Sequence, residues 1–233
     1  ARREAGAPGD AFAPDGQNWG NPTFRWDILR EQNFGWWLRR FSRMLALYDV
    51  VRLDHFIGFS SYFGIPAGKT ARDGAYAFGP GVELEAARKQ FGPLPFIAED
   101  LGAITPAVRA LVAATGFLGM DVAQFSDDDV REGYVPRPET VAYTGTHDNQ
   151  TLVGFCEGRY GLEREEAREV ADGIMRRVLA SDADVAIVPL QDVLGLGDEA
   201  RMNVPGVADG NWSWRAPDAD VAAAASRLAE LAE

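Results

Sequence analysis

The sequence predicts an α/β fold that is the C-terminal part of an eight-stranded (β/α)8 TIM barrel, and two observations support this prediction. Three short apolar runs, at 50–54, 95–98 and 141–144, each end in a cluster of acidic or His-Asp residues. Barrel enzymes gather their catalytic groups at the C-terminal ends of parallel strands. Strands alternate with helices in only about five units, whereas a complete barrel has eight. We therefore expect residues 1–233 to form one partial catalytic barrel whose first strands are missing from this chain.

The first quarter of the chain predicts a loop, a helix and a strand. Residues 1–22 are rich in Gly, Pro, Asp and Asn without a hydrophobic period, which indicates a long loop. Apolar residues at helical spacing predict one amphipathic helix over 27–48. The β-branched run at 50–54 predicts a strand, and the Gly-rich segment 57–81 is expected to be a connection.

The rest of the chain continues this alternation. A helix over 83–91 is expected to end at Gly92-Pro93, and Thr105-Pro106 provides an N-cap and a first-position proline for another helix. The remaining predicted elements are strands at 95–98, 120–125, 141–144 and 185–189, and helices at 105–114, 162–180 and from about 217 to the end.

Composition limits the possible partners. The formal net charge of −12 argues against nucleic acid and against an anionic membrane surface, since both favour Lys and Arg. No apolar run approaches the length of a membrane span, and the N-terminal residues lack the apolar core of a signal peptide. The single cysteine, Cys156, cannot form an internal disulfide and fits a reducing compartment, so we expect a cytoplasmic protein. Core packing is its expected role, ahead of nucleophilic catalysis.

Three carboxylates follow predicted strands: Asp54, Glu99 and Asp148. Glycosidic bond chemistry uses one acid to protonate the leaving oxygen and one carboxylate to attack. A third carboxylate can stabilise the oxocarbenium-like transition state. Because another strand separates Glu99 from Asp148, we expect these two to face one another across the mouth of the barrel.

Two neighbours strengthen this interpretation. Arg52 lies two residues before Asp54, so both side chains point to the same side of the strand and the cation would keep Asp54 charged and oriented. His147, beside Asp148, is a donor suited to sugar hydroxyls. Each cluster alone could be a structural ion pair, a solvated loop or a turn, but three at successive strand ends favour a catalytic site.

Several stretches, taken in order along the chain, resemble one known family. They are Gly16-Gln17-Asn18-Trp19-Gly20-Asn21-Pro22, Arg52-Leu53-Asp54-His55-Phe56, Ile65-Pro66-Ala67-Gly68, Ala98-Glu99-Asp100-Leu101-Gly102, Tyr143-Thr144-Gly145-Thr146-His147-Asp148-Asn149, Arg201-Met202-Asn203-x-Pro205-Gly206 and Asn211-Trp212-Ser213-Trp214-Arg215. The set is similar to the α-amylase clan and, more narrowly, to the C-terminal part of the 4-α-glucanotransferases, the amylomaltase or disproportionating enzyme family.

The resemblance implies an activity and a role for each acid. Such an enzyme transfers α-1,4-glucan segments between maltooligosaccharides by a retaining double displacement. Asp54 would be the nucleophile, Glu99 the general acid and base, and Asp148 the transition-state stabiliser. No metal or cofactor is implied, and the N-terminal remainder of the same enzyme is an expected partner.

The resemblance also implies the residues that bind α-glucan. They are Gln17, Trp19, Asn21, Arg52, His55, His147, Asn149 and Asn203. Residues 1–22 would cover the active site, and a cover that excludes water favours transfer to a sugar over hydrolysis.

Three alternatives stay open. The first is a retaining α-glucan hydrolase of the same clan. The second is a barrel that uses the three acids to hold Mg²⁺, although each acid lies beside Arg or His rather than in an all-oxygen cluster. The third is an inactive, glucan-binding fragment.

Overall fold

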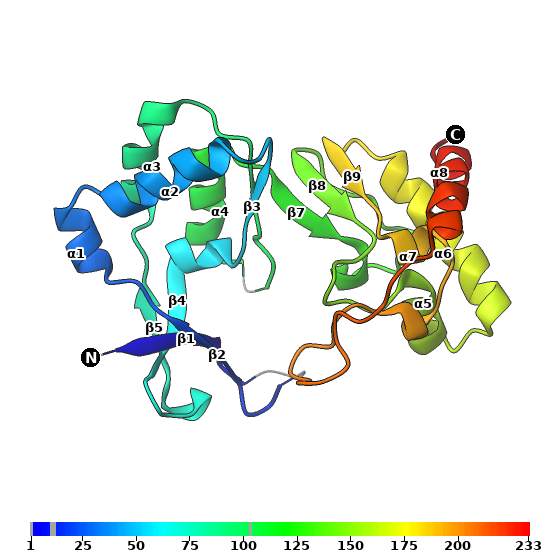
Figure 1. Ribbon diagram of the computed structural model, residues 1–233, viewed down its shortest axis with the longest axis horizontal. Helices are drawn as coiled ribbons and strands as arrows, with labels where there is room; N and C mark the ends of the chain where they lie inside the picture. Colours follow the sequence, from blue (N-terminus) through cyan, green and yellow to red (C-terminus); the bar gives the residue numbers. More distant parts are fainter. Residues whose placement is uncertain (1, 10–12, 103) are drawn as a thin grey trace. The chain divides into compact units, whose positions relative to one another are not determined.

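The computed structural model describes residues 2–9, 13–102 and 104–233, and the chain divides into two compact units, Ala1–Gly119 and Met120–Glu233. The elements of the first unit are β1 (Arg3–Ala7), β2 (Gln17–Pro22), α1 (Trp26–Glu31), α2 (Gly35–Leu45), β3 (Val51–Leu53), β4 (Ser61–Pro66), β5 (Ala75–Phe78), α3 (Val82–Arg88), β6 (Phe96–Ala98) and α4 (Pro106–Thr115) (Figure 1). Those that follow are β7 (Gly119–Val122), β8 (Thr140–Tyr143), α5 (Leu152–Tyr160), α6 (Arg164–Leu179), β9 (Val185–Ile187), α7 (Leu190–Val193) and α8 (Asp218–Ala232).

The strands predicted for the barrel are confirmed. β3 pairs in parallel with β6, with Arg52 opposite Ile97, and an isolated parallel bridge joins Ile97 to Leu118 just before β7. In the second unit β8 lies between β7 and β9, and it pairs with β9 in parallel. The predicted helix at 105–114 is α4, whose N-cap Thr105 accepts a hydrogen bond from the Val108 N–H at 3.3 Å.

The loop predicted over 1–22 and the connection predicted over 57–81 are wrong as secondary structure. Their described residues form one antiparallel sheet in the order β2-β1-β4-β5. Gly6 shows why the sequence does not predict this sheet: the strands approach so closely there that a Cβ would lie 2.1 Å from the Gln17 carbonyl oxygen. Strands that must approach so closely use glycine and lack the alternating apolar residues that identify a strand. Residues 1 and 10–12 of the predicted loop lie outside the described part.

The single helix predicted over 27–48 is also wrong. It is broken between α1 and α2, where Asn33 and Phe34 have φ angles of 50° and 54°. This left-handed turn allows Phe34 to be buried with Trp37 and Phe41 in the core of the first unit. The apolar spacing continues across the break, so periodicity alone does not reveal it.

The core of the first unit is largely aromatic. Phe41 on α2 and Phe96 on β6 are both 2% exposed, and their ring centroids lie 5.3 Å apart.

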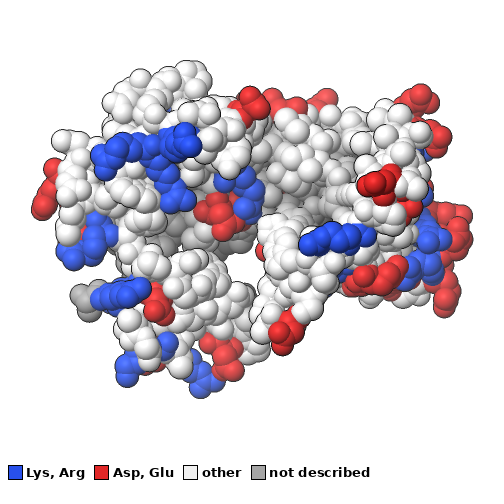
Figure 2. Space-filling view, in the orientation of Figure 1, with Lys and Arg blue, Asp and Glu red and all other residues white. Residues whose placement is uncertain are grey.

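The outer face of α2 carries the exposed Arg39, Arg40 and Arg43. Figure 2 shows basic side chains gathered over this helix. The helix therefore fixes the parallel strand pair from one side and faces water with its charges.

The second unit has an aliphatic core between its sheet and α5 and α6. Val153, Ile174, Met175 and Val178 are fully buried there. Cys156 on α5 belongs to the same cluster, and burial raises the pKa of its thiol to about 12. The predicted packing role of Cys156 is thus confirmed, since a nucleophilic cysteine requires a depressed pKa. Among the described residues, no helix is both long and apolar enough to cross a membrane.

A buried ion pair ties α3 to its surroundings and gives a stability prediction. Glu85 and Arg88 are both buried and paired, and Arg88 also donates to the Gly92 and Thr115 carbonyl oxygens at 2.9 and 3.3 Å. Removing one partner leaves a buried charge, so Glu85→Gln should lower the free energy of unfolding by about 3 kcal/mol. Urea denaturation measures this change, and the apolar double variant E85L/R88M should restore much of the loss. An equally large loss in both proteins would contradict the unpaired-charge explanation.

Candidate active site

Asp54 and Glu99 occupy the same edge of the parallel pair. Leu53 at the end of β3 is opposite Ala98 at the end of β6, and each acid directly follows its strand. Backbone bonds continue past the strands, from the Glu99 N–H to the Leu53 carbonyl at 3.0 Å and from the Phe56 N–H to the Glu99 carbonyl at 3.0 Å. The ladder therefore fixes the backbone that carries both acids, as the strand-end pattern predicts.

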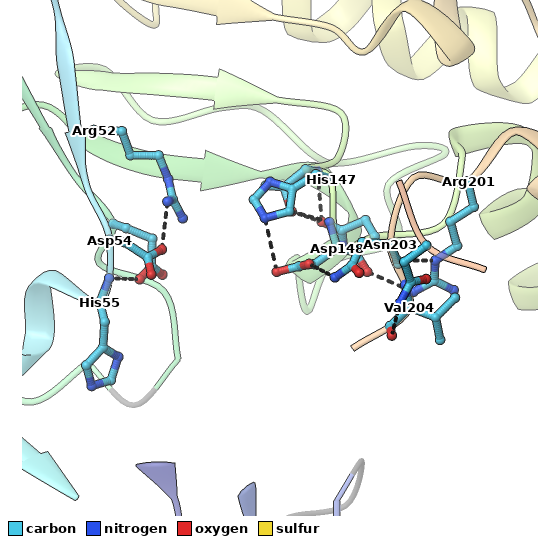
Figure 3. Close-up of polar contacts among 12 residues, drawn as sticks. Arg52, Asp54, His55, His147, Asp148, Arg201, Asn203 and Val204 are labelled. Atoms are coloured by element: carbon cyan, nitrogen blue, oxygen red, sulfur yellow. Dashed lines mark hydrogen bonds and ion pairs between the residues drawn. The ribbon is translucent and has the colours of Figure 1, made fainter. Parts of the chain in front are cut away.

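Asp54 is oriented by Arg52. The Arg52 Nη1 donates to Asp54 Oδ1 at 2.7 Å, as the i, i+2 spacing predicts (Figure 3). The Asp54 side chain is 80% exposed and that of Arg52 only 32% exposed. The carboxylate thus has one oxygen held by a fixed cation and remains open to a ligand.

Glu99 is held by backbone donors and is partly buried. The His55 N–H donates to its Oε2 at 2.7 Å, and the Leu101 N–H donates to its Oε1 at 3.1 Å. Burial raises the pKa of Glu99 to about 7, although these two N–H groups and the Arg52 charge oppose the rise. A carboxyl group with a pKa near neutrality can both give and take a proton, which suits general acid and base catalysis.

His55 links Asp54 and Glu99 to the β2 strand. Its φ of 48° is left-handed, and its ring meets the half-exposed Trp19 edge-on at 4.9 Å. A Cβ on Gly58 would lie 2.9 Å from the His55 ring, so glycine provides the space for it. Burial lowers the pKa of His55.

Of the predicted binding residues on β2, Trp19 and Asn21 are exposed and Gln17 is half-buried. Trp19 Nε1 donates to Gln17 Oε1 at 3.1 Å, and the Asn21 side chain also faces solvent. The structure therefore brings Trp19 and Gln17 together, and Trp19 to His55. Their contact with a sugar stays a prediction.

Asp148 is the centre of a separate group in the second unit (Figure 3). Asn203 Nδ2 donates to Asp148 Oδ1 at 2.6 Å, and His147 Nε2 lies 3.4 Å from Asp148 Oδ2. The predicted residues His147, Asp148 and Asn203 are thus brought together. Asn149 instead shapes the turn, because its Oδ1 accepts from the Thr146 N–H and hydroxyl, both at 2.8 Å. A direct role of Asn149 in binding stays a prediction.

Two further residues of this group received no role from the sequence. Arg201 Nη2 donates to the Asp148 carbonyl oxygen at 2.7 Å. Trp212 lies 5.4 Å from the His147 ring and is itself half-exposed in a left-handed conformation, with φ of 60°. A signal for Arg201 exists, because it precedes Asn203 by the same two residues that separate Arg52 from Asp54.

The predicted site residues therefore form two groups, one in each unit. Glu99, Asp54, Arg52 and His55 belong to the first unit, and the Asp148 group belongs to the second. The expectation that Glu99 and Asp148 face one another stays a prediction. Across the described ranges, no three His, Cys, Asp or Glu side chains are grouped so as to hold a metal ion.

Comparison with known proteins identifies similar sequences. A family model described as 4-alpha-glucanotransferase matches residues 1–220. The chain is 43% identical to the 4-alpha-glucanotransferase of Thermus thermophilus, over 91% of this chain and 47% of that protein. It is 39% identical to the chloroplastic/amyloplastic 4-alpha-glucanotransferase of Solanum tuberosum, over 91% of this chain and 40% of that protein. The chain thus spans about half the length of the curated relatives it matches.

Solved structures show the same fold. An amylomaltase from Streptococcus agalactiae in complex with acarbose superimposes with a TM-score of 0.89 at 35% identity, covering 98% of this chain and 50% of that one. The amylomaltase from Corynebacterium glutamicum has a TM-score of 0.81 at 19% identity, covering 99% of this chain and 42% of that one. The second likeness concerns the fold alone. The α/β partial-barrel fold predicted from the strand ends is thereby confirmed.

Proposed function

Because this chain belongs to the 4-alpha-glucanotransferase family, we propose that it transfers α-1,4-glucan segments between maltooligosaccharides by a retaining double displacement. The observation that carries the proposal is the pair at the β3 and β6 ends. Arg52 holds an exposed Asp54, and beside it a partly buried Glu99 has its pKa raised to about 7. One carboxylate that can attack and one acid that can give a proton are the two groups that a retaining mechanism needs.

In the first step Asp54 attacks the anomeric carbon of the donor glucan. Glu99 gives its proton to the glycosidic oxygen, the bond between that oxygen and the anomeric carbon breaks, and a β-glucosyl ester of Asp54 forms. In the second step the ionised Glu99 takes the proton of an acceptor hydroxyl. That oxygen bonds to the anomeric carbon, the ester bond breaks and Asp54 is released with the α-configuration restored in the product.

Asp148 stabilises the oxocarbenium-like transition state as its positive charge develops. The Asn203 amide, which donates to Asp148 Oδ1, supports this role because it fixes the carboxylate. The exposed faces of Trp19 and Trp212 offer stacking surfaces for sugar rings. A relative that holds acarbose supports a ligand of the glucan class.

Residues 1–22 act as a cover that excludes water and so favours a sugar acceptor, and the β2 strand within them supports this because it brings Trp19 to His55. The N-terminal remainder of a longer enzyme completes the barrel, since the relatives are about twice as long as the matched region. The cytoplasmic location inferred from the lone buried Cys156 stays a prediction.

Incubation of the chain with maltotriose tests the proposal. We expect a ladder of longer maltooligosaccharides together with glucose, because each transfer lengthens one acceptor. Chromatography that resolves products by length measures this outcome. Glucose and maltose without longer products would indicate the hydrolase instead. Absence of any product from a folded chain would show that the activity is not contained in these residues.

A further inference from the structure

Asp192 is a deeply buried acid that the proposed chemistry does not use. It lies on α7, just after β9, and is only 1% exposed. A buried carboxylate requires hydrogen-bond donors, and Asp192 has two good ones. The Thr144 hydroxyl donates to Oδ2 at 2.6 Å, and the Leu152 N–H donates to Oδ1 at 2.7 Å.

These two donors are the two ends of one loop. Thr144 directly follows β8, and Leu152 is the first residue of α5. Between them lie residues 145–151, which carry His147, Asp148 and Asn149. One carboxylate therefore fixes both the beginning and the end of the loop that presents Asp148.

The chain after Asp192 holds the same loop at further points. Asp198 accepts from the Thr151 N–H at 3.0 Å and from Gln150 Nε2 at 2.7 Å. Gly154 makes room for it, because a Cβ there would lie 2.4 Å from Asp198 Oδ1. Arg201 and Asn203 then reach the Asp148 backbone and side chain themselves. The segment 192–203 thus contacts both ends of the 145–151 loop, residues 150 and 151 within it, and Asp148 at its centre.

We propose that Asp192 is a positioning residue for Asp148, which it orients by tying together the two ends of the 145–151 loop. The inference rests on the proposed role of Asp148. A group chosen only for stability would be apolar at such a position, since buried charge is costly. Burial indeed raises the pKa of Asp192 to about 6, with the Asp198 charge adding to the rise and the two hydrogen bonds opposing it.

The sharpest test is Thr144→Val, which removes one donor and keeps the shape of the side chain. Thr140→Val is its matched control. Thr140 is a buried threonine four residues earlier, and its hydroxyl donates to the Arg137 carbonyl at 2.6 Å, away from the loop. The chain has only two histidines, so the imidazole NMR signals of His147 report on the loop and those of His55 report on the first unit.

We expect T144V to shift the His147 signals and to speed amide hydrogen exchange over 145–152 by about tenfold or more, as for loss of a charged hydrogen bond. His55 should be unchanged, and T140V should leave His147 and the loop exchange as in the parent chain. Asp192→Asn, which can still accept from Leu152, should fall between the parent and T144V. Equal loop exchange and His147 signals in T144V and T140V would overturn the inference.

Activity separates this inference from the proposed function. With maltotriose, T144V should lower kcat about tenfold with little change in KM, because Asp148 acts in the transition state. T140V should retain the parent kcat. An active parent chain that tolerates Asp148→Asn would refute the role of Asp148, whereas the NMR and exchange results decide whether Asp192 positions the loop even then.

Discussion

Replacement of Asp54 by Asn is expected to abolish glucan transfer, with a fall in kcat of about 10⁴-fold or more, as for removal of a nucleophile. An amide cannot form the glucosyl ester. The fold should be retained, because the Asp54 side chain is 80% exposed and an amide of nearly the same shape fits in its place. Product formation from maltotriose measures the loss, and circular dichroism checks the fold.

Asp27→Asn is the matched control for this variant. Arg25 and Asp27 form another Arg-x-Asp pair, bonded at 3.0 and 2.6 Å and exposed, but on the first turn of α1 rather than at a strand end. Its loss should leave transfer within about twofold of the parent. Mass spectrometry of the quenched reaction with maltotriose should place an added maltosyl mass on the peptide that contains Asp54. Near-normal activity of D54N, or the mass on another peptide, would show that the nucleophile is misassigned.

Glu99→Gln is expected to lower kcat with maltotriose by about 10³-fold, within the range for general acid and base catalysis. An α-maltosyl fluoride donor should restore the first step, because fluoride leaves without a proton. The second step then lacks its base, so the maltosyl ester of Asp54 should accumulate. Added azide needs no base and should release it as the α-glycosyl azide. Parent-like turnover of maltotriose by E99Q would contradict the assignment of Glu99.

The raised pKa of Glu99 gives two pH predictions for the parent chain. Because the proton must be present for the first step, kcat/KM for maltotriose should fall as the pH rises through about 7. The folded state also binds this proton more tightly than the unfolded state, whose pKa is near 4.5. The resulting stabilisation is complete below pH 4.5 and is lost as the pH rises to about 7.

Glu99→Gln removes this cost of ionisation. At pH 8 the variant should be more stable than the parent by about 2 kcal/mol, less than the full shift in pKa implies, because the carboxyl group is partly exposed to water. At pH 4 the two chains should differ little. Urea unfolding at both values measures the difference. A more stable parent at pH 8 would show that Glu99 is not held in an unfavourable environment.

Much of the candidate site follows from the sequence because strand ends are local signals. A β-branched run stops at Arg52 and Asp54, and an apolar run stops at Glu99. These patterns identify both the strands and the strand ends at which the acids lie. The Arg52–Asp54 bond follows from the two-residue repeat of a strand in the same way. The helix at 105–114 was equally predictable from the sequence, since Thr105 and Pro106 form a local cap.

The sequence by itself determined the parallel strands, the acids that follow them and the family, because each rests on neighbouring residues. Only the tertiary structure decided the proton affinity of Glu99, which depends on burial and on N–H groups from His55 and Leu101. It also decided the antiparallel sheet, where Gly6 allows a close approach that no local period predicts. The hydrogen bond from Thr144 to Asp192 was also decided by the tertiary structure, since a bond between residues 48 positions apart leaves no local pattern in the chain.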